Sequence, residues 1–273
     1  MTLSVNTNVG AMAALQSLNA TNKELTTTQS RINTGLNVSS TKDDSAKYTV
    51  AQTLRGDLGG LTAVSSSLST AKSTTDVAVA GGEQVSDLLI QMRSKALEAT
   101  DSGITDDSRS ALGKDVDALK DQINTIIKSS TFNGINLLDG STDAVSALQS
   151  TDTTQDSLSV TNQDFASDVT GLGATFTDAT SAKTMVTNIE AASKSVLGKL
   201  STLGSASRKI DGQSTFISKL SDAIEAGVGN IVDADLAKES AKLQALQVKQ
   251  QLGVQALSIA NQAPQTITSL FRG

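Results

Sequence analysis

The residues that could carry out chemistry in this chain are mainly carboxylates and hydroxyls, because the sequence contains no His and no Cys. The adjacent carboxylates Asp43-Asp44 could serve as a general acid and base. Asp233-Ala234-Asp235 resembles the start of a calcium loop, but Lys238 stands where that loop requires Gly and no Glu occupies the twelfth place. With no ligand cluster beside it, the acid pair is better explained as a helix N-cap with first-turn carboxylates.

Other chemical classes are excluded by composition. Without His and Cys the chain has no disulfide, no usual zinc site and no Ser–His–Asp or Cys–His catalysis. The segment Gly171–Phe176 lacks the third Gly of a dinucleotide fingerprint. We therefore expect no catalytic residue, no cofactor and no metal. A net charge of −6 argues against nucleic acid as a partner, and no apolar run is long enough for membrane insertion.

The elements that must carry any function are long helices. Aromatic residues make up 2% of the 273 positions and Pro occurs once, so the core must come from Leu, Ile, Val and Ala in segments without the strongest helix breaker. This composition favours long, thin helical packing over a sheet-based core.

Apolar stripes at alternating steps of three and four mark both chain ends. The first stripe runs through residues 11–36 with polar interruptions at Asn22 and Gln29, and the last runs from Val232 to Phe271 with interruptions at Glu239 and Gln250. A helix with one apolar seam needs a partner, so we expect the two ends to pair as a coiled coil and to supply the self-assembly interface. The residues predicted for that interface are Leu15, Leu18, Leu25, Ile32, Leu36, Leu236, Leu243, Leu246, Leu257, Ile267 and Phe271.

Inner helices are expected at 54–99, 109–128 and 182–226, after a hinge at about residues 35–44. The first carries Gly59-Gly60 and Gly81-Gly82, where we expect a kink or a close helix crossing. The last has Ile or its equivalents at strict seven-residue intervals from Ile189 to Ile224, and Gly227 and Gly229 are expected to end it.

The stretch from Ser129 to residue 181 differs from the rest. Asn133-Gly134 and Asp139-Gly140 are dipeptides of tight turns around a short apolar run, which predicts a β-hairpin. Residues 141–181 are rich in Ser, Thr and Asp, and we expect short strands and loops there as the most exposed part of the chain.

These patterns predict a mainly α fold: a long antiparallel helical bundle, a terminal coiled coil of the N- and C-terminal helices, and a small β-hairpin region. Residues 1–40 and 232–273 would form the terminal coiled-coil domain. Residues 41–231 would form the helical bundle, with its β and loop region at about 130–181.

Several motifs at both ends, in this order, resemble bacterial flagellin, the subunit of the flagellar filament. They are Ser4–Asn8 with Ala11-Met12, Gln29–Leu36, Asp43-Asp44, Thr131–Gly140, Asp233–Glu239 and Asn261–Gln265 ahead of Leu270-Phe271-Arg272. The resemblance covers roughly residues 1–140 and 182–273. The roughly 40 residues between leave little room for the outer domains that flagellins often carry.

The resemblance implies a structural protein of the extracellular filament that polymerises with itself for swimming motility. The paired terminal helices would line the filament channel. It also implies export of the unfolded chain by the flagellar type III apparatus, and the N-terminus indeed lacks the basic residues of a secretory signal. Partners would be an export chaperone, the filament cap and the hook–filament junction proteins.

Departures and rival readings accompany the resemblance. The run Leu89-Ile90-Gln91-Met92-Arg93 differs from the one in flagellins that the innate receptor detects, which predicts weak or no receptor activation. The Ser- and Thr-rich middle is a candidate for O-linked sugars.

A hook–filament junction protein with flagellin-like termini is the main alternative, and an intracellular helical bundle would explain the heptads but not the ordered motifs. An inserted HExxH protease is excluded by the absence of His.

Overall fold

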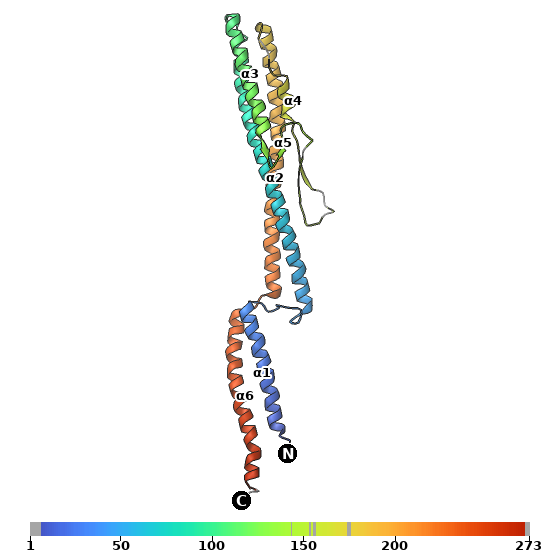
Figure 1. Ribbon diagram of the computed structural model, residues 1–273, viewed down its shortest axis with the longest axis vertical. Helices are drawn as coiled ribbons and strands as arrows, with labels where there is room; N and C mark the ends of the chain where they lie inside the picture. The colour runs from blue at the N-terminus through green and yellow to red at the C-terminus, as the bar shows by residue number, and fades with distance from the viewer. Residues whose placement is uncertain (1–6, 143, 153, 155–156, 174–175, 271–273) are drawn as a thin grey trace. The chain divides into compact units, whose positions relative to one another are not determined.

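The computed structural model describes residues 7–142, 144–152, 154, 157–173 and 176–270, with the side chains of 263–270 left out, and divides the chain into two compact units. The first unit is Met1–Gly56 with Ala223–Gly273, and the second is Asp57–Asp222. Figure 1 shows long helices, with strands only in the segment between α3 and α5. The predicted mainly α fold is confirmed.

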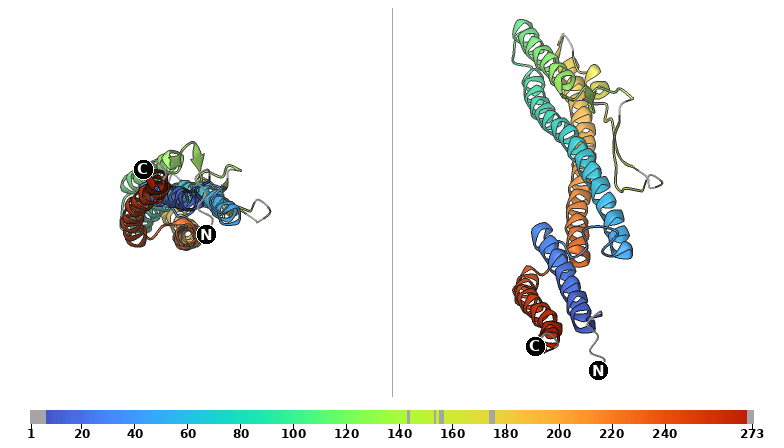
Figure 2. Two further views of the ribbon diagram at one scale, coloured as in Figure 1. Left: turned by 90° about the horizontal axis from the view of Figure 1, so that it is seen from below. Right: turned by 60° about the horizontal axis from the view of Figure 1, so that its bottom comes forward.

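In the first unit, α1 (Val9–Thr34) and α6 (Leu236–Leu270) lie side by side, as the views of Figures 1 and 2 agree. They run antiparallel, since residue 8 bonds to residue 260 and residue 31 to residue 239. The Asn8 side chain accepts from the backbone N–H of Ala11 and so caps the start of α1. Gly35 ends the helix at φ 71°, a left-handed conformation that Gly adopts without steric penalty.

A joint of two paired linkers connects these helices to α2 (Ser45–Glu98) and α5 (Ala179–Val232). The N–H of Ala234 donates to Gly35 O at 2.9 Å, and the N–H groups of Asn37 and Val38 donate to Val232 O at 2.7 and 3.2 Å. Beneath these bonds lies a small apolar cluster. Its buried members are Val38, Ala51, Val228 and Val232, with Leu36, Tyr48, Leu54, Ile224 and Ile231 packed against them.

This joint explains why α5 does not end where the sequence predicted. Gly227 and Gly229 each lower helix stability by about 1 kcal/mol relative to Ala. The helix nevertheless continues to Val232, so that prediction was wrong. Continuing the helix buries Val228 and Val232 in the joint cluster, and burial of a Val side chain contributes roughly 1.5 kcal/mol or more.

In the second unit, α2 and α5 pack together and α3 (Asp106–Ser129) lies alongside α2 (Figures 1 and 2). The heptad residues of α5 from Ile189 to Ile217 are buried as predicted, and Ile224 is half-buried. Gly81 and Gly82 are points of close approach, since a Cβ at Gly82 would lie 3.0 Å from the Phe165 ring and one at Gly81 would overlap the Ser130 side chain. The predicted close crossing is therefore present.

The predicted β-hairpin is formed by β1 (Thr131–Phe132) and β2 (Ile135–Asn136), which pair antiparallel around Asn133 and Gly134. Both turn residues have positive φ, 50° and 81°, as a tight hairpin turn requires. A second antiparallel pair, β3 (Ala144–Ala147) with β4 (Leu158–Thr161), follows in the stretch expected to hold short strands.

The segment 141–181 also departs from its prediction as the most exposed part of the chain. It contains a short helix, α4 (Phe165–Thr170), and buries a set of apolar residues against the bundle. They are Val145, Ala147, Val160, Phe165, Val169, Leu172 and Phe176. Lys199 of α5 holds α4 in place, because its Nζ donates to Asp168 Oδ2 and to Asp164 O, each at 2.7 Å. Ser- and Thr-rich composition concealed this packing, since the apolar residues are sparse and irregularly spaced.

The start of α2 agrees with the predicted cap, because Asp44 accepts from the backbone N–H of Lys47 at 3.0 Å. The start of α3 is capped by Thr105, whose side chain accepts from the backbone N–H of Ser108. Asp43 instead binds the linker before α2, where its Oδ2 accepts from the backbone N–H and hydroxyl groups of both Ser39 and Ser40. The acid pair thus has a structural role at this helix start.

Candidate self-assembly interface

The candidate functional site of this chain is a surface for association with other copies, not a metal or membrane site, as far as the chain is described. Across the described ranges, no group of three or more His, Cys, Asp or Glu residues is placed to hold a metal ion. None of the helices, as far as they are described, is both long and apolar enough to cross a membrane. The apolar faces of α1 and α6 are therefore considered as the interface that the sequence predicts.

The inner faces of α1 and α6 form an intramolecular seam. On α6 the residues turned inward follow the predicted stripe: Glu239 and Leu246 are buried, and Leu243, Gln250, Gly253 and Leu257 are half-buried. Gly253 lets the helices approach closely, since a Cβ there would lie 3.2 Å from Leu18 Cδ1. The seam on α6 therefore has the register that the sequence predicts.

On α1 every second residue of the seam lies one position before the residue that the sequence predicted. The buried positions are Thr21 and Thr28, while Gln29 is exposed and Asn22 is half-buried. Thr21 can be buried because its hydroxyl donates to Ser17 O at 2.9 Å, within its own helix. The Thr28 hydroxyl is buried without a hydrogen-bond partner among the described residues, so only Thr21 is satisfied in this way. Counting only aliphatic residues as seam members missed both positions.

Polar contacts cross the seam at three places. Gln250 Nε2 donates to Asn22 Oδ1 at 2.7 Å, Arg31 Nη1 donates to Glu239 Oε1 at 3.2 Å, and Asn8 Nδ2 donates to Ala260 O at 2.7 Å. Polar pairs at fixed places in an apolar seam favour one register over slipped alternatives. They specify how α1 and α6 fit together.

The outer faces of both helices carry apolar side chains that nothing in the described chain covers. On α6, Val248, Leu252 and Ile259 are 56%, 58% and 69% exposed. Their spacing of four and seven residues places them on one side of the helix, away from the seam. On α1, Val9 and Met12 are 70% and 62% exposed. The outer face of α6 is therefore apolar along several turns, whereas the outer face of α1 is apolar only in its first turn.

The predicted interface residues are divided between these environments. Leu246 is buried in the seam, and the half-buried residues are Leu18, Leu25, Ile32, Leu36, Leu243 and Leu257. Leu15 and Leu236 are about half exposed, at 48% and 49%. The side chain of Ile267, and Phe271 altogether, lie outside the described residues. Sequence reasoning did not single out Val248, Leu252 and Ile259, although their spacing could have indicated a second stripe.

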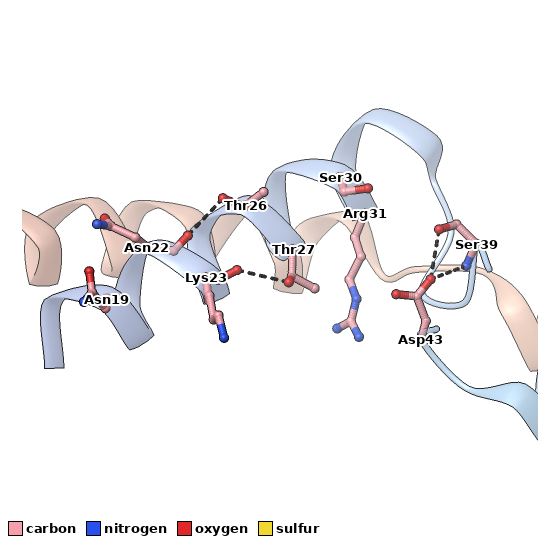
Figure 3. A pocket seen from close by; sticks show the side chains of 9 residues that line it. All are labelled: Asn19, Asn22, Lys23, Thr26, Thr27, Ser30, Arg31, Ser39 and Asp43. Atoms are coloured by element: carbon pink, nitrogen blue, oxygen red, sulfur yellow. Dashed lines mark hydrogen bonds between the residues drawn. The ribbon is translucent and has the colours of Figure 1, made fainter. Parts of the chain in front are cut away.

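A polar groove continues the outer face of α1 toward the joint (Figure 3). It has a volume of ≈ 830 Å³ and is lined by hydroxyl and amide side chains of α1, by Lys23 and Arg31, and by Ser39 and Asp43. Figure 3 shows the side chains of Lys23 and Arg31 extending to the same side of the helix. The hydroxyl and backbone N–H of Ser39 that bind Asp43 hold the pKa of its carboxyl below the usual value.

Comparison with known proteins identifies the family. A model of the bacterial flagellin N-terminal helical region matches residues 5–143, and a model of the flagellin C-terminal helical region matches residues 186–271. The chain belongs to the bacterial flagellin family. The matched ranges agree with those that the sequence motifs indicated, and the residues between the two matches, 144–185, contain β3, β4, α4 and the first turns of α5.

Named relatives extend along the whole of this flagellin-family chain. Flagellin FljK of Caulobacter vibrioides is 48% identical over 269 residues, which cover 98% of each chain. A flagellin of Brucella melitensis is 35% identical over 282 residues and 99% of each chain. The coverage on both sides agrees with a short flagellin in which the bundle carries no large insertion.

Solved structures share the fold at low sequence identity. Bacillus cereus flagellin aligns with a TM-score of 0.50 and 24% identity over 54% of this chain and 86% of that chain. A putative flagellar hook-associated protein from Vibrio parahaemolyticus aligns with a TM-score of 0.59 and 17% identity over 70% and 100%. Because both kinds of protein have this fold, the fold does not separate them, whereas the full-length relatives are flagellins.

Proposed function

We propose that this flagellin-family chain self-assembles into the bacterial flagellar filament through the outer faces of its terminal helices. The observation that carries the proposal is the second apolar face on α6, made by Val248, Leu252 and Ile259. Each Val, Leu or Ile side chain buried between copies contributes roughly 1.5–3 kcal/mol. Three such residues repeated at every lattice contact supply strong cohesion.

Charge distribution supports the same surface. No Asp, Glu, Lys or Arg occurs in residues 1–22 or 250–271. Their described parts, residues 7–22 and 250–262, face each other in the antiparallel pair, so this part of the pair presents amide, hydroxyl and apolar groups to a neighbour. Neighbouring copies can then pack without bringing like charges together.

The seam residues have a supporting role in this proposal. Leu18, Leu25, Leu243 and Leu246 hold α1 against α6, and this pairing presents the outer faces in a fixed arrangement. Residues 1–40 and 232–273 act as the polymerising module, and residues 41–231 act as the helical body. Leu15 and Leu236 lie on the seam side of their helices and are about half exposed, so they are at its edges.

The remaining expectations follow from family membership and belong to the proposal. The chain is a structural protein without catalytic activity. It is exported unfolded by the flagellar type III apparatus with a chaperone, added beneath the filament cap and retained outside the cell beyond the hook–filament junction proteins. Keeping the terminal module unpaired until neighbours are present prevents premature polymerisation.

Seeded polymerisation followed by electron microscopy tests the proposed surface. Leu252→Gln with Ile259→Gln removes apolar area from the outer face, and we expect loss of filaments with the monomer's helix content unchanged. Leu97→Gln with Leu197→Gln is the matched control, because these two residues are 53% and 52% exposed in the second unit. The control pair should polymerise as the unchanged chain does.

Two further variants test whether the terminal helices hold the filament together. Leu25→Asp buries a charge in the seam, so it should prevent filament formation while the second unit stays folded. Truncation before Val232 should leave soluble protein. Normal filaments from the Leu252→Gln and Ile259→Gln variant would contradict the outer-face proposal, and absence of polymer from the unchanged chain would contradict the filament function itself.

A further inference from the structure

We infer that the loop after β3 is a clasp that joins α2 to α5 where α3 does not reach, and that it opens without unfolding of the helices. The clasp is defined as residues 148–152, which follow β3 directly. Every contact that carries this inference lies inside the second unit. The inference is therefore independent of the proposed filament function.

The helix α3 accompanies only one end of the α2–α5 pair (Figure 1). It ends just before Ser130, which lies against Gly81 of α2. Between Gly81 and the start of the second unit, α2 continues beside α5, and Lys72 Nζ lies 3.7 Å from Asp211 Oδ2 across this stretch. A pair of helices leaves part of each apolar stripe uncovered, so a further layer is needed there. The strands β3 and β4 supply it, since each has a buried face.

The side of α2 beneath this layer carries small residues at intervals of seven. They are Gly60, Ser67, Thr74 and Gly81, and the spacing places them in one row along the helix. Ser67 Oγ accepts a hydrogen bond from the backbone N–H of Leu148 at 3.1 Å. At Gly60 a Cβ would lie 2.6 Å from Thr151 Cγ2, so Thr151 occupies the space that a side chain there would fill. The pair Gly59-Gly60 thus includes a second point of close approach.

The clasp also binds α5. Gln213 Nε2 donates a hydrogen bond to the backbone oxygen of Gln149 at 2.7 Å. Beside the clasp lies a groove of ≈ 490 Å³, whose lining includes Leu61 of α2 and both Ile217 and Leu220 of α5. The clasp therefore contacts both helices at the edge of the apolar seam that they share.

Opening of the clasp breaks fewer bonds than unfolding of the helices does. The ladder of β3 with β4 ends at the pair of Ala147 and Leu158, so the clasp lies outside it. Leu148 is 47% exposed, and Thr151 is also exposed. A single hydrogen bond contributes little net stability, and segments with few buried apolar contacts open locally. The clasp therefore exchanges between a closed and an open state while α2 and α5 stay helical.

Amide hydrogen exchange of the dilute full-length protein, followed by mass spectrometry, tests the clasp. Gly60→Ala improves the helix propensity of α2 but drives a methyl group into Thr151. We expect the amides of residues 148–152 to exchange about tenfold faster or more, and those of residues 210–220 in α5 about two- to fivefold faster. Gly59→Ala is the matched control, because a Cβ there meets nothing within 4 Å, and it should leave both segments unchanged.

A rescue variant separates the contact from other effects of the substitution. Thr151→Ser removes the methyl group that Ala at position 60 would overlap, so Gly60→Ala with Thr151→Ser should return the exchange of the clasp to within about twofold of the unchanged chain. Faster exchange in Gly59→Ala and Gly60→Ala alike, or no rescue, would overturn the packing of the clasp on Gly60. Faster exchange in the clasp with unchanged exchange in α5 would show that the loop covers the pair without joining it.

A disulfide can lock the clasp, since the chain has no Cys. A Cβ at position 60 lies 3.3 Å from Thr151 Cβ, close to the range of about 3.5–4.5 Å that disulfides span. With oxidised glutathione, dilute Gly60→Cys with Thr151→Cys should form the intramolecular bond in most molecules and slow exchange in residues 210–220 relative to its reduced form. Gly59→Cys with Thr151→Cys is the control and should not close. Equal yields from both pairs, or no slowing after closure, would contradict the clasp.

Discussion

Gln250 donates a hydrogen bond to Asn22 across the seam of the terminal helices, at 2.7 Å between Nε2 and Oδ1. Both side chains are half-buried, so each compensates for the other's loss of water. The bond ties a position near the middle of α1 to one near the middle of α6. The bond fixes the register of the two helices more than it adds to their stability.

Replacing one member of this pair should therefore lower the stability of the α1–α6 pair more than replacing both. We expect Gln250→Leu to destabilise the α1–α6 pair by about 1–3 kcal/mol, because Asn22 loses its partner in a half-buried site. The double variant Asn22→Leu with Gln250→Leu should recover most of that loss. Thermal depolymerisation followed by circular dichroism measures both, and equal losses in single and double variants would contradict the pairing.

Two helix glycines should respond in opposite directions to the same substitution. Gly81→Ala drives a methyl group into Ser130 and Leu138, so we expect a loss of roughly 1–3 kcal/mol in the free energy of unfolding. Gly198→Ala meets nothing within 4 Å in α5, so it should stabilise by about 0.5–1 kcal/mol through helix propensity. Thermal unfolding of the two variants side by side tests the claim, which fails if both shift the same way.

Acid should loosen the joint through Asp43. Its folded pKa lies below the usual value of 3.8, because Ser39 and Ser40 donate hydrogen bonds to the carboxylate. A lowered pKa means that the stabilisation is present above pH 3.8 and is lost as the pH falls through the folded value. Asp43→Asn should thus destabilise the joint at neutral pH and make no difference well below pH 3.8.

Tyr48 provides the readout for this change. It is the only Tyr in a chain without Trp, and it packs against the joint cluster. Its near-ultraviolet circular dichroism should differ between the two proteins at neutral pH and converge in acid. A difference that persists unchanged in acid would show that Asp43 acts through something other than its charge.

Arg109 should not tolerate replacement by Lys. Its guanidinium is buried and donates to the carbonyls of both Ala99 and Asp101, where α2 ends. A Lys ammonium cannot reproduce this forked geometry, so we expect Arg109→Lys to lower stability by about 1–3 kcal/mol. Arg208→Lys, at an exposed site on α5, is the matched control and should leave the unfolding temperature unchanged.

Sequence periodicity predicted most of the helical framework for a physical reason. The seven-residue spacing from Ile189 to Ile217 can be satisfied only by one buried face along a long helix, and that face is buried. The register of α6 was also predicted correctly, because Leu243, Leu246 and Leu257 lie on the face that the alternating three- and four-residue spacing selects.

Features governed by tertiary packing were not predictable in this way. Thr21 and Thr28 are seam residues, but Thr is equally common on exposed helix faces. The helix α4 has only six residues, too few to show a period, and Phe165 is buried through its contact with the bundle. The outer face of α6 was overlooked because the longer inner stripe accounted for the helix pattern by itself.

The paired linkers at the joint have a mechanical consequence. A single linker with free rotation about its bonds would let the α1–α6 pair swivel, and twist applied to the pair would be dissipated there. Here the linkers on both sides are tied by backbone bonds from Ala234 to Gly35 and from Asn37 and Val38 to Val232, with an apolar cluster beneath. The start of α2 and the end of α5 are therefore held together at the joint, so a twist applied to the α1–α6 pair acts on both of them at once.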